Sequence, residues 1–346
     1  MKDFWAKLPK PFFALAPLED VTDAAFRRLI ARYGKPDVMF TEFTSADGLF
    51  FANDSGQAKL QAKLLFSDSE RPIVAQLFTA SPERMKKAAE QVAKLGFDGI
   101  DINMGCPDKA VEKSGCGAAL IKNPVLAREL IRAAGEGSAS RRMPVSVKTR
   151  IGYAEDELDT WLPELLAENI SAVTIHARTR KEMSDVPARW DAVAKAVAIR
   201  DSLGSKTLII GNGDVTHIED ARPVRGKTML RSASESWTSN GARTKAEMSG
   251  CDGVMLGRAI FGNPFLFANS RELANTKDVK LKALSEHIQL FEELLSKTSN
   301  YSTLKKHFAS YVKGWDGAKE FRMKLMETNT VAEALSILDS SRYLNL

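Results

Sequence analysis

The stretch Asp98-Gly-Ile-Asp-Ile-Asn-Met-Gly-Cys-Pro-Asp-Lys109 decides how the rest of the chain is interpreted. Its apolar residues Ile100, Ile102 and Met104 alternate with other residues, which predicts a buried strand. The Gly-Cys-Pro that follows ends the strand, because proline lacks the N–H that a strand ladder needs. The thiol of Cys106 therefore stands at the exit of a core strand, where α/β proteins carry reactive groups. A reactive thiol and a small buried hydrophobe are both compatible with that position.

Seven further apolar runs of strand length occur along the chain, and helix-compatible sequence follows them. They lie at residues 12–18, 38–43, 72–78, 144–150, 172–177, 207–213 and 253–257. Eight strands that alternate with helices predict an α/β fold, with a parallel sheet closed as a (β/α)8 TIM barrel. A doubly wound open sheet is the alternative. It would need fewer strands and usually a Gly-rich turn after the first one, which is absent here.

The composition is typical of a soluble globular protein: of 346 residues, 44% are hydrophobic and 27% charged. No uncharged apolar run reaches the ~18–20 residues that span a bilayer. The three cysteines, Cys106, Cys116 and Cys251, show no disulfide spacing, so we expect free thiols and a cytoplasmic location. We also expect a monomer. Four scattered histidines predict no metal site. The net charge of +5 is compatible with a polyanionic partner.

The strand pattern stops near residue 276, where helical periodicity begins. Leu281, Leu284, His287, Ile288 and Phe291 share one predicted helix face. We therefore predict two domains, a barrel over residues 1–272 and a small helical bundle over 273–346. Taken singly, the basic residues of the bundle are typical of a solvated face; they are Lys305, Lys306, His307, Lys313, Lys319, Arg322 and Lys324.

A basic, Ser-rich insertion is predicted at about residues 218–250, between the last two strands of the barrel. Its charged residues include Arg222, Arg225, Lys227, Arg231, Glu235, Arg243, Lys245 and Glu247, and Trp237 lies among serines. This composition is typical of a solvated loop. The alternative is a functional one, in which these basic residues contact the phosphate backbone of a nucleic acid.

Polar residues recur at the carboxyl ends of the predicted strands, where barrels carry their active sites. Burying a polar side chain costs free energy unless a partner satisfies it, so polar ends on six strands indicate a bound ligand. These ends are Gln76, Asn103 with Cys106, Lys148 with Arg150, His176 with Arg178, Asn212 to Asp214, and Gly257 with Arg258. The last two of these strand ends match the usual phosphate site of such barrels. Together they predict a phosphorylated, ring-bearing cofactor.

Seven motifs, in family order over about residues 12–267, resemble the tRNA-dihydrouridine synthases. They are Ala16-Pro-Leu-Glu-Asp-Val-Thr-Asp23, Asp101-Ile-Asn-Met-Gly-Cys-Pro107, Gly115-Cys-Gly-Ala118, Val147-Lys-Thr-Arg150, Thr174-Ile-His-Ala-Arg178, Gly211-Asn-Gly-Asp214 and Gly253-Val-Met-Leu-Gly-Arg-Ala259. The resemblance implies an FMN-binding barrel that reduces a uridine in tRNA, with NADPH as the electron donor. It also implies that the helical domain binds tRNA.

The same resemblance implies roles for individual residues. Contacts to the cofactor fall on Ala16, Pro17, Leu18, Gln76, Lys148, His176, Asn212, Gly213, Asp214, Gly257 and Arg258. Asn103 and Arg178 are expected to face the uracil. Cys106 is expected to give the proton to C5, because a thiol with a pKa near 8.5 is protonated at neutral pH. Cys116 is the competing thiol, since spacing alone does not exclude it.

Two other functions remain open at the level of the sequence. One is an FMN barrel that acts on a small pyrimidine, as dihydroorotate or dihydropyrimidine oxidoreductases do. The basic helical tail disfavours this reading, because so small a substrate needs no such surface. The other is an RNA-binding relative without catalysis, which the presence of Cys106, Lys148, His176 and Arg258 disfavours.

Overall fold

A computed structural model describes residues 3–218, 241–268 and 276–343, and within these ranges the predicted TIM barrel is confirmed. All eight predicted strands are present, and a two-residue strand, β3, was not predicted. The strands are β1 (Phe12–Leu15), β2 (Met39–Phe40), β3 (Thr44–Ser45), β4 (Ile73–Phe78), β5 (Gly99–Met104), β6 (Val145–Arg150), β7 (Ala172–His176), β8 (Leu208–Asn212) and β9 (Gly253–Leu256).

Every strand pair in the sheet is parallel, and the order is β1-β9-β8-β7-β6-β5-β4-β2, with β3 paired to β4. A parallel bridge between Ala14 and Val38 joins the two ends of this order and closes the barrel. Because all the strands run in one direction, their carboxyl ends meet at one face. The predicted site residues therefore converge there.

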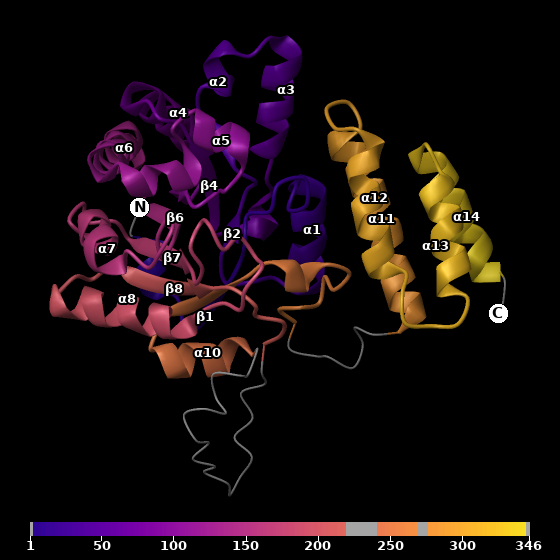
Figure 1. The fold of residues 1–346 in the computed structure, drawn as a ribbon. Helices are drawn as coiled ribbons and strands as arrows, with labels where there is room; N and C mark the ends of the chain where they lie inside the picture. The colour runs from indigo at the N-terminus through magenta and orange to yellow at the C-terminus, as the bar shows by residue number, and fades with distance from the viewer. Residues whose placement is uncertain (1–2, 219–240, 269–275, 344–346) are drawn as a thin grey trace, which may run out of the picture.

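Helices surround the barrel and lie between its strands in the chain (Figure 1). They are α1 (Ala24–Tyr33), α2 (Gly48–Phe51), α3 (Asp54–Lys63), α4 (Pro82–Leu95), α5 (Lys109–Lys113), α6 (Pro124–Ser138), α7 (Leu158–Leu166), α8 (Trp190–Ser202) and α10 (Ala242–Ser249). The Asp23 side chain caps α1 by accepting a hydrogen bond from the Phe26 N–H. Ser81 caps α4, which has proline at its first position, where the missing N–H costs nothing.

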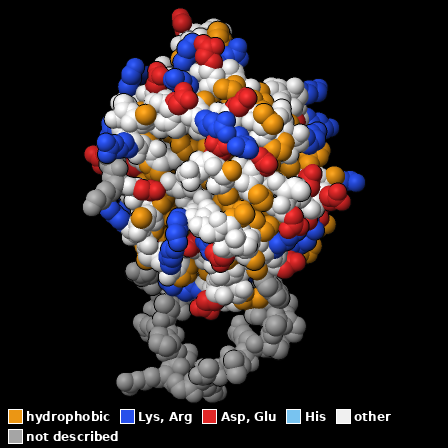
Figure 2. Space-filling view, turned by 90° about the vertical axis from the view of Figure 1, so that its left-hand side faces the viewer, with side chains coloured by type: hydrophobic (Ala, Val, Ile, Leu, Met, Phe, Trp, Pro, Cys, Tyr) orange, Lys and Arg blue, Asp and Glu red, His pale blue; other side chains and the backbone are white. Residues whose placement is uncertain are grey.

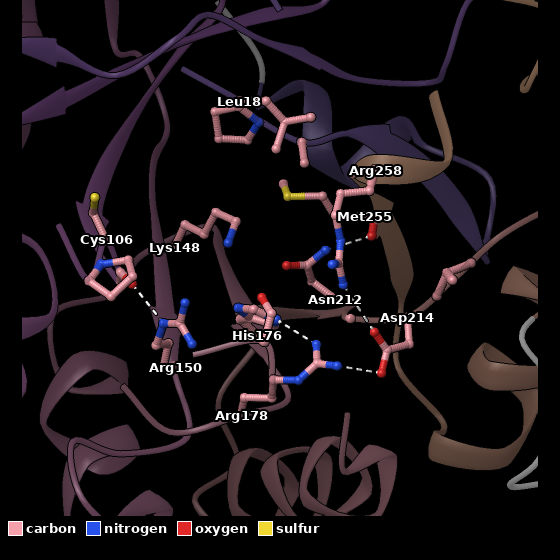
Figure 3. Close-up of a pocket in the computed structure, with 18 of the residues that line it drawn as sticks. Leu18, Cys106, Lys148, Arg150, His176, Arg178, Asn212, Asp214, Met255 and Arg258 are labelled. Atoms are coloured by element: carbon pink, nitrogen blue, oxygen red, sulfur yellow. Dashed lines mark hydrogen bonds and ion pairs between the residues drawn. The ribbon is translucent and has the colours of Figure 1, made fainter. Parts of the chain in front are cut away.

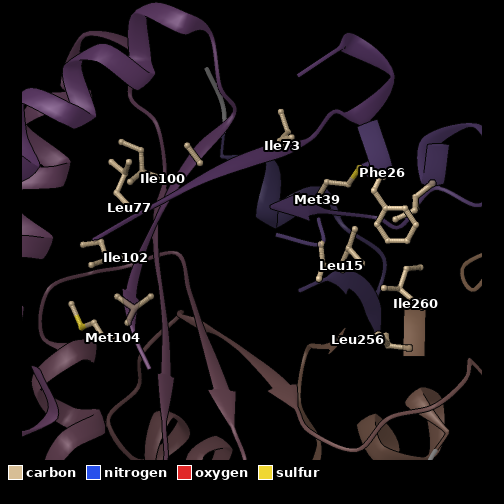
Figure 4. Close-up of a cluster of buried hydrophobic side chains, with 14 of the residues drawn as sticks. Leu15, Phe26, Met39, Ile73, Leu77, Ile100, Ile102, Met104, Leu256 and Ile260 are labelled. Carbon is tan, nitrogen blue, oxygen red and sulfur yellow. The ribbon is translucent and has the colours of Figure 1, made fainter. Parts of the chain in front are cut away.

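The hydrophobic core has two layers. The outer layer fills the space between strands and helices, where Leu15, Phe26, Ile100 and Leu256 belong to one cluster (Figure 4). A smaller cluster lies inside the barrel and includes Phe12, Phe40, Val74, Ile210 and Met255. The two sets come from alternate positions of the strands, as the two-residue period of a strand requires. The inner positions of β4, β5 and β6 are polar instead: Gln76, Asp101, Asn103, Ser146 and Lys148.

Four C-terminal helices are described (Figure 1): α11 (Lys277–Leu295), α12 (Tyr301–Tyr311), α13 (Ala318–Glu327) and α14 (Val331–Tyr343). Helix α11 packs against α1, and α12 and α14 pack against α11. His287 of α11 and His307 of α12 face each other at 4.6 Å between ring centroids. Both contact the ring of Phe26, at 5.0 and 4.6 Å. Across the same junction Tyr33 donates a hydrogen bond to Glu286 (2.8 Å), and Lys306 pairs with Asp20 (2.8 Å).

Two sequence interpretations in this half of the chain are corrected. His307 does not share the solvated basic face, because it is 1% exposed beneath α1. Residues 242–249 of the predicted insertion form α10 and not a loop. Lys245 of that helix is buried, with its ammonium 5.8 Å from the Trp190 ring. The apolar partners of α10 are distant in sequence, so its own basic composition concealed it.

The remaining insertion residues, Arg222, Arg225, Lys227, Arg231, Glu235 and Trp237, lie outside the described residues. The predicted boundary at 272/273 does so as well, and the two-domain division stays a prediction. In the described part of the chain, no helix is long and apolar enough to cross a membrane.

Figure 2 shows one face of the molecule, on which Lys and Arg are interspersed with Asp and Glu. The helices on this side carry paired charges, such as Arg128 with Glu164 and Glu168, and Lys86 with Glu136. Opposite charges at this spacing cancel each other's field beyond a few ångströms. This face is therefore a poor surface for a polyanion.

Candidate active site

A pocket of about 730 Å³ opens at the carboxyl ends of the strands, within the size range of cofactor sites. Residues from β4, β5, β6, β7, β8 and β9 or the loops that follow them line it (Figure 3). All the residues predicted to bind cofactor or uracil and the predicted acid are among its lining residues: Ala16, Pro17, Leu18, Gln76, Asn103, Cys106, Lys148, His176, Arg178, Asn212, Gly213, Asp214, Gly257 and Arg258. The fold thus brings the whole predicted set into one cavity.

The two candidate thiols differ in position, because Cys106 lines this pocket and Cys116 does not. Cys106 lines the pocket and is half-buried, beside Lys148 and Arg150 (Figure 3). Burial raises the pKa of its thiol above the ordinary value, which favours the protonated form at neutral pH. Cys116 is 1% exposed and its sulfur faces the Ser114 carbonyl oxygen at 3.6 Å, away from the lining of the pocket. Cys251 is buried, and its thiol faces the Gly253 carbonyl oxygen at 3.1 Å.

The loop that carries Cys106 is held from two sides. The side chain of Asn103 accepts hydrogen bonds from the backbone N–H groups of Gly105 (3.1 Å) and Cys106 (2.9 Å). On the other side, the guanidinium of Arg150 donates to the Gly105 carbonyl oxygen (2.8 Å). The same guanidinium donates to the carbonyl oxygens of Thr179 and Met183, which belong to the loop after β7. Arg150 therefore ties the thiol loop to the neighbouring loop.

Lys148 supplies a half-buried cation that lines the pocket. Burial, reinforced by the nearby Arg150 and opposed by Asp101, lowers the pKa of its ammonium to about 8. In the described part of the structure, no carboxylate forms a salt bridge with Lys148. A half-buried ammonium without a carboxylate partner favours a ligand that offers acceptor atoms or negative charge.

His176 and Arg178 act together. Arg178 is 2% exposed, and its guanidinium donates to Asp214 (2.5 Å), to the Val186 carbonyl oxygen (2.6 Å) and to Nε2 of His176 (3.2 Å). Since arginine only donates, Nε2 of His176 is the acceptor and its ring proton resides on Nδ1. Burial, reinforced by Lys148, lowers the pKa of His176 well below its ordinary value, so this imidazole is neutral.

The loops after β8 and β9 bring the residues of the predicted phosphate site, Gly213, Gly257 and Arg258, to the pocket, and we call this group the anion cradle. Gly213 (φ +130°) has a conformation that side chains disfavour, and a Cβ there would lie 2.7 Å from the Cβ of Ala188. Arg258 is exposed at the rim, and its guanidinium lies 3.4 Å from the Asp214 carboxylate. Asp214 is already neutralised by Arg178, so the cradle keeps a positive balance. The donor set of the pocket therefore fits a phosphorylated, acceptor-rich ring such as a flavin mononucleotide.

Three residues that shape the site were not predicted as part of it. Arg150 stood at a strand end but was given no role, and Asp101 and Ser146 were overlooked. A signal was present: the two-residue period of a strand puts Asp101 on the same side as Asn103, and Ser146 on the same side as Lys148.

Comparison with known proteins identifies the family. The family model described as "Dihydrouridine synthase (Dus)" matches residues 14–230 and 235–345. A Staphylococcus aureus (strain COL) protein with the name "Probable tRNA-dihydrouridine synthase" is 41% identical over 340 residues, 98% of this chain and 95% of its own. A Bacillus subtilis (strain 168) protein, "Probable tRNA-dihydrouridine synthase 2", is 39% identical over 98% of this chain and 96% of its own. With the site geometry described above, these matches show that the chain belongs to the dihydrouridine synthase family.

Proposed function

We propose that this protein reduces a uridine of tRNA to 5,6-dihydrouridine, with FMN in the pocket and NADPH as the electron donor. The observation that carries the proposal is the convergence of Cys106, Lys148 and Arg258 on one pocket of a dihydrouridine synthase barrel. The names of the relatives in Staphylococcus aureus and Bacillus subtilis support the substrate.

When bound, FMN supplies the hydride that C6 of uracil receives. The protein has to supply the proton for C5, and the thiol of Cys106 is the group we assign to this step. Its raised pKa keeps the proton on sulfur at neutral pH until the transfer. The ammonium of Lys148 offsets negative charge on the bound rings. The amide N–H groups of Gln76 and Asn103 orient acceptor atoms of these rings.

The helical group α11–α14 is the surface we assign to tRNA. It lies beside the pocket mouth, because Lys306 of α12 pairs with Asp20, two residues after the pocket residue Leu18. Lys313, Lys319 and Lys324 are exposed on the following turns and helix. Ammonium groups that contact phosphates at the pocket mouth would hold the tRNA while one uridine is rotated into the barrel.

The test is a reduction assay on unmodified tRNA transcripts with FMN and NADPH, in which dihydrouridine is mapped position by position by mass spectrometry. Wild type is expected to form dihydrouridine at a defined position. Cys106→Ala is expected to lose nearly all product and keep the bound flavin spectrum. Cys116→Ala is the matched control, because it removes a thiol outside the pocket, and it is expected to keep its activity.

Two outcomes would contradict the proposal. A flavin-loaded wild type that leaves every transcript unchanged but reduces free uracil would indicate a small-molecule oxidoreductase. Full activity of Cys106→Ala would move the proton donor to another group.

A further inference from the structure

Four polar side chains form a line inside the barrel wall beneath the pocket. They are Gln76 of β4, Asp101 and Asn103 of β5, and Ser146 of β6, and each is 7% exposed or less. The register of the sheet places Gln76 beside Asp101, and Asp101 beside Ser146. Buried polar groups at such density persist only where they satisfy one another.

The hydrogen bonds connect β6 to the thiol loop, and their donors point toward Asp101 from both sides. Ser146 Oγ donates to Asp101 Oδ1 (2.6 Å), and Gln76 Nε2 donates to Asp101 Oδ2 (2.7 Å). Asn103 Nδ2 donates to Gln76 Oε1 (3.2 Å). Asn103 Oδ1 then accepts from the backbone N–H groups at the start of the Cys106 loop, 2.9 Å from the nitrogen of Cys106 itself.

The two ends of this line determine how both amides are turned. A carboxylate only accepts, so Gln76 must present its NH2 group to Asp101 and its oxygen to Asn103. Backbone N–H groups only donate, so Asn103 must present its oxygen to the thiol loop. Each end therefore enforces the orientation that the other requires. In this orientation each amide has one N–H left over for the pocket, and Asn103 Oδ1 already accepts two hydrogen bonds.

We propose that Asp101, held by Ser146, is a positioning residue for the reaction: it sets the amide orientation of Gln76 and Asn103 and thereby the place of the Cys106 loop. The role of Asp101 in the reaction rests on the proposed function. The hydrogen-bond line itself rests on the structure alone. Asp101 does not line the pocket, so it acts only through the residues that do.

Substitutions at Asp101 separate its acceptor role from its charge. Asn at position 101 can still accept from Gln76 through Oδ1 and donate through Nδ2 to Ser146 Oγ, which can accept. The line is then preserved and the negative charge is lost. Leu at position 101 has a similar size but leaves Gln76 Nε2 buried without an acceptor, and an unpaired buried donor turns or moves to find one.

The matched control is Asp252→Leu. Asp252 is 7% exposed at the opposite end of the barrel, where it accepts from the Ile209 N–H (2.9 Å) and pairs with Arg200 (2.7 Å). It has no contact with the line beneath the pocket. Its loss reproduces the removal of a buried carboxylate without touching the proposed device.

The experiment measures two quantities for each variant. The first is the rate at which iodoacetamide alkylates Cys106 in protein without tRNA, followed by peptide mass spectrometry. The second is the single-turnover rate of dihydrouridine formation at saturating tRNA. We expect Asp101→Leu to raise the alkylation rate about threefold or more and to slow product formation about tenfold to a hundredfold, since small displacements of reacting groups have effects of this size. Asp101→Asn and Asp252→Leu should stay near wild type in alkylation.

Wild-type alkylation and turnover in Asp101→Leu would overturn the proposal, as would an equal change in Asp252→Leu. If Asp101→Leu does not fold, the pair Asp101→Asn and Ser146→Ala replaces it. Each single variant keeps the line, but the double variant leaves Nδ2 of residue 101 unpaired. The fold-change in its alkylation rate should therefore exceed the product of the fold-changes in the two single variants. A fold-change equal to that product would overturn the inference. A wild type that makes no dihydrouridine refutes the proposed function only, because the alkylation arm needs neither tRNA nor turnover.

Discussion

The histidine pair between α1 and the C-terminal helices predicts a specific loss of stability in acid. His287 and His307 are each no more than 1% exposed, and in the described structure none of their ring nitrogens has a hydrogen-bond partner. Burial lowers the pKa of His307 from 6.5 to about 4 and that of His287 well below 6.5. Both imidazoles are therefore neutral, and a proton added to either would place a cation against the ring of Phe26.

The size of the effect follows from linkage. The unfolded chain takes up the proton near pH 6.5, and the folded chain only near pH 4, so the free energy of unfolding falls as the pH drops through this interval. His307 alone then removes about 2 kcal/mol at pH 5 and about 3 kcal/mol at pH 4. Asp23 has the opposite sign, because burial raises its pKa from 3.8 to about 6 and the folded chain binds its proton more tightly.

Because Asp23 contributes with the opposite sign, the informative quantity is the difference in the free energy of unfolding between His307→Leu and wild type. Leucine has a similar size and no titrating group. Urea unfolding at pH 7 and pH 5 should show the variant gaining about 2 kcal/mol relative to wild type on acidification. The same comparison between pH 7 and pH 8 is the control and should show no change, since the imidazole is neutral in both states there. An equal stability difference at pH 7 and pH 5 would refute the reasoning.

Three further predictions concern packing, a buried ion pair and the anion cradle. Gly262→Ala should strongly destabilise the docking of α12, because φ is +67° and the added Cβ would overlap a backbone carbonyl oxygen of α12. Gly317→Ala is the control, since φ is +75° but the space around it is free, and it should cost only about 1 kcal/mol in thermal unfolding. Arg27→Met should cost about 3 kcal/mol in urea unfolding, because the fully buried carboxylate of Glu70 would lose its partner at 2.8 Å and keep only Arg28 at 4.0 Å. A loss below 1 kcal/mol would contradict this. Arg258→Met should weaken FMN binding about tenfold or more in a fluorescence titration and leave riboflavin binding unchanged, because only FMN carries the phosphate; an equal loss for both ligands would argue against the cradle.

The barrel was predictable because its strands are short apolar runs with clear ends. The strand β3 was not, since Thr44 and Ser45 are only two residues and carry no periodic signal. Helix α10 was missed for a related reason: its basic residues resemble a solvated loop, and what buries it is the surface of α8, including Trp190, some fifty residues earlier in the chain. Local patterns predict elements, whereas the partners of an element come from the whole fold.

The site was predictable as a set of residue types at strand ends, and the fold brings that set together. What could not be predicted is how its members bond to one another. The period of a strand indicates which side chains point inward, but the line from Asp101 to Asn103 depends on the register between β4 and β5. The pairing of His287 with His307 likewise depends on the crossing of two helices that are separate in sequence.

The density of positive charge in the pocket has a consequence for the lifetime of the protein. Burial lowers the pKa of Lys148 to about 8 and that of Arg150 to about 10, which means that the fold holds both cations against an opposing free energy. An acceptor-rich anion that binds only the folded state adds stability by mass action, about 2.7 kcal/mol at a hundred times its Kd. Cofactor supply is therefore expected to control abundance as well as activity. In a cell depleted of flavin, the barrel would open more often at its catalytic face and be degraded sooner.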